Sequence, residues 1–132
     1  MEGALGIEQL KRLPNLIEER RKNGVLLQAA FSNHPDIIIQ KEIGESSWFG
    51  FSLVIRPGSQ LTRKALVLKL QELGFECRPI VAGNFAKNEV VKYFESEVHG
   101  ALKNADHIDQ NGLFVGNHHF PIPDAITALS NI

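Results

Sequence analysis

Apolar residues in the first thirty positions recur every three or four residues, which is the spacing of one face of an α-helix. They are Ile7, Leu10, Leu13, Ile17, Leu27, Ala30 and Phe31, and the charged run 18–22 lies between them on what we interpret as a solvated face. The spacing predicts a helix from Gly3 to about Phe31. Pro14 lacks a backbone N–H and its ring clashes with the carbonyl four residues earlier, so we expect a kink or a break near Leu13.

Two strands are predicted after this helix. The β-branched run that starts at Ile37 and continues to Ile43 is typical of a strand. The stretch 47–55 then alternates strictly, which predicts a strand whose odd positions, Phe49, Phe51, Leu53 and Ile55, pack against helices. A lone Trp most often packs in a core, but Trp48 lies at a strand start within reach of a ligand. We therefore keep Trp48 as a candidate binding residue.

The second half of the chain predicts shorter elements. Pro79 has no backbone N–H to donate to a neighbouring β-strand, which indicates that its strand lies at a sheet edge or ends early. The expected elements are a helix over 61–73 ended by Gly74, a strand over 75–82, a short helix capped by Asn88, another capped by Asn104 and ended by a left-handed Asn111–Gly112 pair, a strand over 113–115, and a last helix begun near Pro123.

This order of elements predicts an α+β fold, in which a small antiparallel or mixed sheet has helices mainly on one face. The 132 residues are enough for a single domain over 1–132. The chain begins within an amphipathic pattern without a helix cap and closes within a helical one. We therefore expect it to be part of a longer protein.

Charge and composition exclude several function classes. Fourteen Lys and Arg against fifteen Asp and Glu leave a net charge of −1 with both signs scattered, which does not suggest nucleic acid or an anionic membrane as a partner. No apolar run approaches the ~20 residues of a membrane span. The single Cys77 excludes an internal disulfide, and no signal peptide is evident, so we expect a cytoplasmic protein.

Two predicted strand ends carry the candidate binding groups. Each ends in Gly-Asn followed by further side chains, Gly83, Asn84 and Phe85 in one case and Asn117, His118 and His119 in the other. We expect both ends on the same side of the sheet, close enough for one ligand to touch both. Arg78 is a further candidate, because a guanidinium suits phosphate or carboxylate. The alternative is that both pairs are ordinary turns in which each Asn bonds its own backbone.

No complete catalytic or metal-binding set is present in the sequence. Adjacent residues of a strand point to opposite faces, so His118 and His119 do not chelate one metal from a regular strand, and no metal is expected. Cys77 shares a strand face with Phe75, which indicates a core thiol rather than an activated thiolate. No glycine-rich phosphate loop is found either. We nominate no catalytic residue.

Four segments resemble the DegT/DnrJ/EryC1/StrS family of pyridoxal-phosphate-dependent sugar aminotransferases. They are EGALGIEQLKRLPNLIEERRKNG, ESSWFGFSL, LGFECRPIVAGNF and NADHIDQNGLFVGNHH, and they cover nearly the whole chain in order. The Arg-Pro-Ile-Val-Ala-Gly-Asn stretch is most similar to the nucleotide-sugar 3-dehydratases that make 3,6-dideoxyhexoses for lipopolysaccharide. The resemblance implies the C-terminal small domain of a fold-type I enzyme, beside a large domain and within a homodimer.

The resemblance also implies which domain binds the cofactor and which residues of this chain face the substrate. Pyridoxal or pyridoxamine phosphate, and the Lys or His that serves it, belong to a large N-terminal domain that this chain lacks. The residues implied on the side of the nucleotide-sugar substrate are Gly83, Asn84, Phe85, Asn117, His118 and His119. Many aminotransferases of the family have Pro-Leu-His where this chain has Gly83-Asn84-Phe85, which favours a dehydratase. An aminotransferase, and a non-catalytic module that binds a small polar ligand, are the alternatives.

Overall fold

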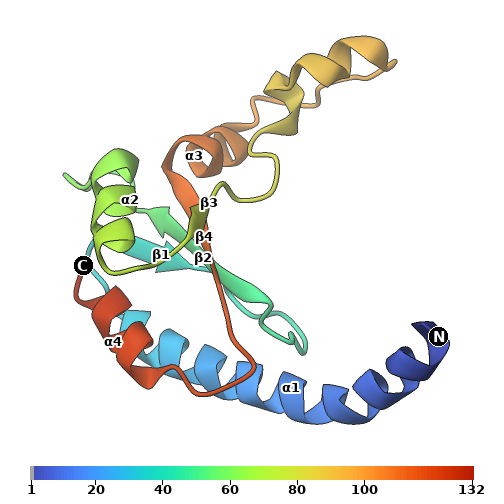
Figure 1. The fold of residues 1–132 in the computed structure, drawn as a ribbon. Helices are drawn as coiled ribbons and strands as arrows, with labels where there is room; N and C mark the ends of the chain where they lie inside the picture. Colours follow the sequence, from blue (N-terminus) through green and yellow to red (C-terminus); the bar gives the residue numbers. More distant parts are fainter. Residues whose placement is uncertain (1) are drawn as a thin grey trace.

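The computed structural model describes residues 2–132, which form a four-stranded antiparallel sheet with helices around it (Figure 1). The strand order is β1-β2-β4-β3. The elements are α1 (Glu2–Phe31), β1 (Ile37–Ile39), β2 (Gly50–Ile55), α2 (Arg63–Glu72), β3 (Cys77–Arg78), the 3-10 helices η1 (Phe85–Lys87) and η2 (Glu89–Tyr93), α3 (Lys103–Asn111), β4 (Gly112–Gly116) and α4 (Pro123–Ser130). The predicted α+β fold is confirmed.

The register of β2 against β4 places the core on one face of the sheet. Phe51 pairs with Val115 and Leu53 pairs with Leu113, and all four side chains are buried. They pack in one cluster with buried residues of three helices, namely Leu27 and Phe31 of α1, Leu66 and Leu70 of α2, and Ile126 and Leu129 of α4. Helices α1, α2 and α4 therefore cover this face, because it carries the large apolar side chains. The opposite face is more open and carries half-buried side chains such as Ser52 and Phe114.

The start of β2 departs from the predicted alternation. Phe49 is 71% exposed, whereas Trp48 is 3% exposed and belongs to the core. Trp48 has a φ of 49°, in the left-handed region, so the pleat of β2 does not extend back through it. The prediction that Phe49 is buried with Phe51 is therefore wrong, and Trp48 serves packing.

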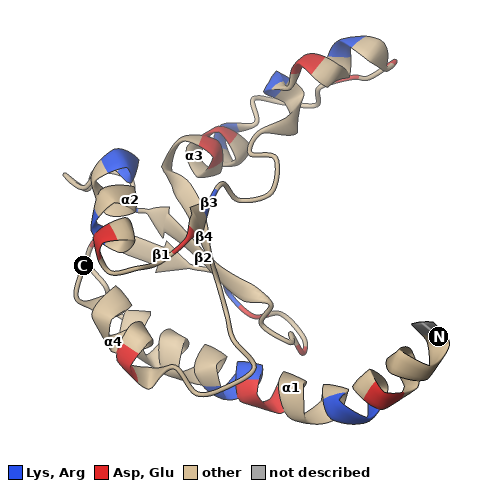
Figure 2. Cartoon of the chain, in the orientation of Figure 1, with Lys and Arg blue, Asp and Glu red and all other residues tan. Residues whose placement is uncertain are grey.

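Helix α1 runs without a break through Pro14 and is curved (Figure 1). Of the two predicted outcomes near Leu13, a kink or a break, the break is therefore wrong. Pro14 removes the helical partner of the Leu10 carbonyl. Every described side chain from residue 3 to residue 15 is exposed, so that carbonyl lies on a part of the helix that water reaches. Charges of both signs are interspersed along α1 (Figure 2). No described helix is long and apolar enough to cross a membrane.

Several predicted boundaries are confirmed and two are wrong. Gly74 follows α2 with a φ of 82°, and β3, which precedes Pro79, is an edge strand. Asn104 lies inside α3 rather than capping it, because the helix already begins at Lys103. Gly112 has an extended backbone, with φ −96° and ψ 146°, because it is already the first residue of β4 and not a left-handed cap.

A close contact between α1 and Trp48 gives a prediction on stability. A Cβ built on Gly24 would lie 2.7 Å from ring atoms of Trp48, whereas one on Gly6 meets nothing within 4 Å. We expect Gly24→Ala to destabilise the chain by about 1–3 kcal/mol through overpacking. The matched change Gly6→Ala should leave stability unchanged or raise it by up to about 1 kcal/mol. Urea denaturation measures both, and equal effects of the two changes would contradict the packing argument.

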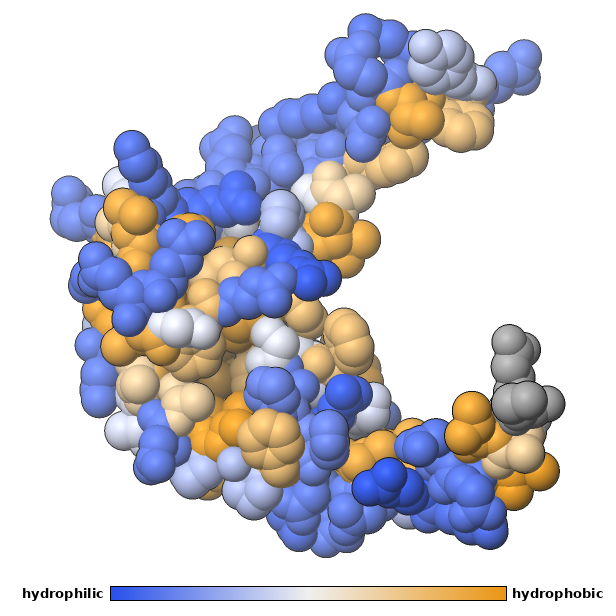
Figure 3. All heavy atoms as spheres, viewed as in Figure 1, coloured by the Kyte–Doolittle hydropathy of each residue, from blue (hydrophilic) through white to orange (hydrophobic). Residues whose placement is uncertain are grey.

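The first turns of α1 present an unpartnered apolar surface, as expected for this helix. Leu5, Ile7 and Leu10 are 65%, 61% and 66% exposed, and apolar atoms gather at this end of the molecule in Figure 3. Exposed apolar patches promote association. We predict that the chain self-associates at high concentration and that changing all three residues to Gln abolishes this. Light scattering measures both, with Glu8→Gln as control, and a strictly monomeric parent chain would contradict the prediction.

Candidate functional site

Two buried amides, Asn23 of α1 and Asn117 after β4, join three segments of the chain. Asn23 Nδ2 donates to Asn117 Oδ1 at 3.1 Å and to the carbonyls of His118 and Phe120 at 3.1 and 2.9 Å. Asn23 Oδ1 accepts from the N–H of Ile122. Asn117 Nδ2 donates to the carbonyls of Arg20 at 3.0 Å and Trp48 at 2.8 Å. This Asn23–Asn117 clasp therefore fixes the segment 117–122 against α1 and the start of β2.

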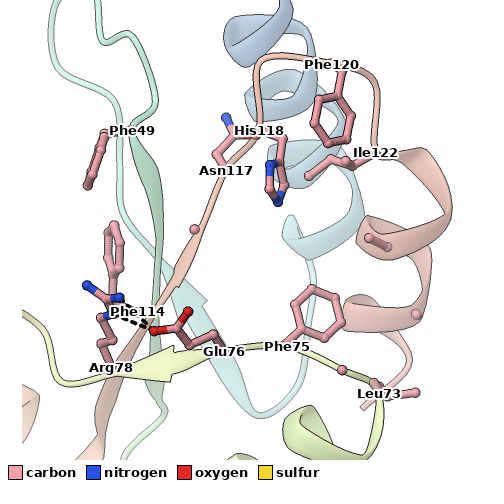
Figure 4. Close-up of a pocket in the computed structure, with 14 residues that line it drawn as sticks. Phe49, Leu73, Phe75, Glu76, Arg78, Phe114, Asn117, His118, Phe120 and Ile122 are labelled. Atoms are coloured by element: carbon pink, nitrogen blue, oxygen red, sulfur yellow. Dashed lines mark hydrogen bonds and ion pairs between the residues drawn. The ribbon is translucent and has the colours of Figure 1, made fainter.

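The segment that the clasp holds forms one wall of a groove of about 620 Å³, drawn in Figure 4. Most of the groove is apolar, and several of its walls are aromatic. The aromatic and aliphatic side chains that line it include Phe49, Phe75, Phe114, Phe120, Leu73 and Ile122. Phe49 and Phe114 stack with ring centroids 6.1 Å apart, and His118 stacks on Phe120 at 4.7 Å.

Two of the four polar side chains that line the groove, Glu76 and Arg78, lie at the β3 edge. Arg78 donates from Nε and Nη2 to one oxygen of Glu76, Oε1, at 3.0 and 2.7 Å. Both side chains are exposed, and Figure 4 shows the Glu76 carboxylate beneath the space between Phe114 and Phe75. An exposed ion pair contributes little to stability. The Arg78–Glu76 pair is therefore better placed to contact a ligand than to hold the fold.

The prediction that both Gly-Asn ends share one ligand site is wrong. β3 runs antiparallel to β4, with Cys77 opposite Val115 and Arg78 opposite Phe114. The chain that leaves β3 therefore moves toward the start of β4, where Asn84 lies against α3, whereas Asn117 lies beyond the end of β4 (Figure 1). Antiparallel neighbours run in opposite directions, so their C-terminal ends lie at opposite ends of the strand pair.

Near the start of β4, Asn84 serves as a turn residue. Its side chain accepts from the N–H of Ala86 at 3.1 Å, as the turn alternative anticipated, and donates to Asp106 at 2.7 Å. Lys87 also pairs with Asp106 at 2.6 Å. The hydrogen bonds from Lys87 and then Asn84 lower the pKa of Asp106, and the bond to Asp106 raises the pKa of Lys87. Gly83 has a φ of 63° and approaches the Asp109 carboxylate so closely that a Cβ would collide with it.

The remaining candidates divide between the groove and other places. Arg78, Asn117 and His118 line the groove. His119 is exposed beside it, with its ring edge-on to Phe120, and Phe85 is exposed in η1. Sequence reasoning missed Phe49, Phe75, Glu76, Phe114 and Phe120. Their signal in the sequence is weak, because aromatic residues on strands are most often core.

Reactive groups outside the groove do not form a second site. Cys77 is half-buried against the core and burial raises the pKa of its thiol, which fits the interpretation as a core thiol rather than an activated thiolate. Within residues 2–132 no three His, Cys, Asp or Glu side chains gather as metal ligands would.

The sheet order, the helices on one face and the groove beside the last strand define an α+β small domain with a ligand-sized groove. The chain belongs to the DegT/DnrJ/EryC1/StrS aminotransferase family, whose model matches residues 1–125. The GDP-4-keto-6-deoxy-D-mannose 3-dehydratase of Yersinia pseudotuberculosis is 55% identical over 133 residues, which cover 100% of this chain and 34% of that protein. The chain spans about a third of the length of such relatives.

Solved structures agree with this assignment. The Escherichia coli GDP-4-keto-6-deoxy-D-mannose-3-dehydratase with bound hydrated pyridoxal phosphate matches with a TM-score of 0.94 and 52% identity, over 98% of this chain and 33% of that one. A variant of the same kind of enzyme, with bound GDP-perosamine, matches equally well at a TM-score of 0.94. The aminotransferase PseC of Helicobacter pylori, at 17% identity and a TM-score of 0.75, shares the fold.

The Asn23–Asn117 clasp gives a second prediction on stability. Asn23→Ala removes the donors to the His118 and Phe120 carbonyls and leaves buried polar groups without partners, each costing about 1–3 kcal/mol. We expect a loss of about 2–4 kcal/mol by urea denaturation. Asn104→Ala, at an exposed position inside α3, is the matched control and should change stability by less than about 0.5 kcal/mol. A similar loss in both variants would show that the clasp does not stabilise the fold.

Proposed function

We propose that this chain is the C-terminal small domain, over residues 1–132, of a pyridoxal-phosphate-dependent nucleotide-sugar 3-dehydratase. In this proposal the full-length enzyme acts on GDP-4-keto-6-deoxymannose in deoxysugar and lipopolysaccharide biosynthesis, and it works as a homodimer. The domain supplies part of the wall that receives the nucleotide sugar, and the cofactor is served by the large domain.

One observation carries the proposal: identity above 50% extends over the whole chain to two curated 3-dehydratases, and the fold superposes on one of them with a TM-score of 0.94. The match is not confined to the core, since it spans the exposed stretch 85–101 and the groove. Function resides in sites rather than folds. Similarity that includes exposed segments therefore supports a shared activity more strongly than the fold does.

The residues that line the groove do not fit pyridoxal phosphate by themselves. No lysine is among the residues that line the groove, and its one guanidinium, Arg78, is already paired with Glu76. The cofactor supplies the carbanion chemistry of such enzymes, and the protein must hold its phosphate and its reactive carbon. We therefore assign no step of the reaction to a residue of this chain, and place its contribution in binding and orienting the substrate.

A sugar aminotransferase of the same family is the second candidate, because PseC and two other solved aminotransferases, at 14–18% identity, share the fold. Such identities carry the fold alone. The sequence Gly83-Asn84-Phe85, in place of the Pro-Leu-His of many family aminotransferases, supports the dehydratase. A non-catalytic binding module is the outcome that remains if the full-length protein turns over no sugar nucleotide.

The assay that decides among these functions uses the full-length protein carrying this chain, with pyridoxal or pyridoxamine phosphate and GDP-4-keto-6-deoxymannose. We expect a product that has lost its C3 hydroxyl, detected by mass spectrometry and NMR. A product with an amino group at C4 would establish the aminotransferase instead. The absence of turnover with the cofactor bound would reject both enzymatic functions.

For the isolated chain, we predict neither useful affinity for pyridoxal phosphate nor turnover of a sugar nucleotide. The physical reason is that positioning and tuning of the cofactor need groups that the groove does not present. Titration with pyridoxal phosphate, followed by visible absorbance, measures the formation of a lysine adduct. A stoichiometric and specific adduct would contradict the prediction, whereas slow, unsaturable labelling of surface lysines would not.

A further inference from the structure

We infer that the segment between β3 and α3, residues 79–102, is a docking arm that binds the large domain of the same polypeptide. This docking rests on the proposed function, because that function places the large domain outside this chain. The arm includes η1 and η2 and extends away from the sheet (Figure 1). Its apolar surface has no cover, its two ends have left-handed backbones, and a much longer solved relative shares its course.

The apolar surface of the arm is not covered by any described residue. Only Asn84, at the base of the arm, has a buried side chain, whereas Val81 is 94% exposed and Tyr93 is 85% exposed. The other large apolar side chains exposed on the arm are Phe85, Val90, Phe94 and Val98. Figure 3 shows apolar atoms on the side of the arm that faces a hollow of the molecule. Such a surface gains stability when a partner removes it from water.

Both ends of the arm have a backbone conformation that L side chains rarely adopt. The φ of Val81 is 50° and the φ of Leu102 is 47°, both in the left-handed region. A β-branched residue there is strained, and such strain persists only where the surroundings impose it. The side chain of Val81 is almost fully exposed, so packing within residues 2–132 does not impose this conformation. The strain therefore indicates that residues outside this chain hold the arm.

Polar contacts at the base of the arm fix its direction. Asn84 donates to Asp106 of α3 at 2.7 Å, and Lys87 pairs with the same carboxylate at 2.6 Å. Further along, Asn88 caps η2 by accepting from the N–H of Val90 at 3.1 Å. These bonds orient the arm without covering its apolar side. A surface that is already ordered loses less conformational entropy when it binds.

The arm follows the same course in a protein that contains much more than this chain. The Escherichia coli relative matches with a TM-score of 0.94 over 98% of this chain, which corresponds to only 33% of that protein. The 24 residues 79–102 are nearly a fifth of the 132 in this chain, so a displaced arm would not allow such a score. The extended arm is therefore the conformation found where the rest of the protein is present.

A second copy of this chain is the rival occupant. The large domain is favoured because this chain covers 34% of the Yersinia relative, so about two thirds of such a protein lies outside the match. Binding within one polypeptide benefits from a high effective concentration that binding between molecules lacks. The first turns of α1, whose apolar side chains are exposed, border the same hollow as the arm (Figure 3). One body that fills the hollow therefore covers both apolar surfaces.

The test introduces a photoreactive residue into the full-length protein carrying this chain, as Tyr93→p-benzoylphenylalanine. After illumination, denaturing electrophoresis separates linked pairs of chains from chains linked internally, and peptide mass spectrometry locates the linked residues. We expect internal cross-links from position 93 to the large domain. Leu68→p-benzoylphenylalanine, at an exposed apolar position of α2 outside the arm, is the matched control and should give no cross-link to that domain.

Cross-links between two chains would assign the arm to a second copy and overturn the inference. Cross-links confined to residues 1–132, or no cross-link at all, would overturn it as well. Failure of the dehydratase assay with the internal cross-link intact would reject the proposed reaction alone. Sugar-nucleotide dehydration by a protein whose position 93 does not link to the large domain would reject the docking alone.

A second variant measures how firmly the arm is held. Phe94→Ser in the full-length protein removes an exposed ring, and we expect amide hydrogen exchange in residues 85–101 to rise at least about tenfold, because weaker docking lets the arm open more often. Leu68→Ser is the matched control and should leave the exchange of this segment unchanged. Equal exchange in Phe94→Ser and in the unchanged protein would contradict the docking of the arm.

Discussion

The arrangement of the groove depends on the hydrogen bonding of two buried amides. Asn23 and Asn117 are 1% and 6% exposed, and burying an amide without partners costs several times more than a hydrogen bond gains. Their partners are the backbone of segment 117–122, of α1 and of the start of β2. Satisfying these amides therefore sets where His118 lies relative to Phe49. The clasp therefore holds one wall of the groove through hydrogen bonds to its backbone.

The sequence predicted the parts of the fold that follow from local rules. Alternation in 51–55, the positive φ of Gly74 and the edge position of the strand before Pro79 each reflect a constraint within a few residues. The reversal at Trp48 was not predictable, because it depends on the room that Gly24, on a distant helix, leaves for the ring. Local pattern does not record such tertiary contacts.

The candidate site likewise combines residues that the sequence identified with residues whose place depends on tertiary contacts. Arg78 and His118 were found because their chemistry is visible residue by residue, and both line the groove. The pairing of Asn84 with Asn117 failed because two strands that end alike were expected to end together, whereas β3 and β4 are antiparallel. Glu76 was not singled out from the sequence. Its place in the groove depends on its pairing with Arg78, two residues later on the same face, and on aromatic side chains from three separate elements.

The open face of the sheet also accounts for the groove between these walls. Gly50 lies so close to Phe114 that a Cβ there would collide with the ring, so the glycine makes room for this side chain. Phe49, which precedes β2, stacks with Phe114 and extends the aromatic surface. Charged side chains at positions 76 and 78 keep the same face wet, which disfavours burial against another apolar layer. The groove therefore combines an aromatic floor with a charged rim.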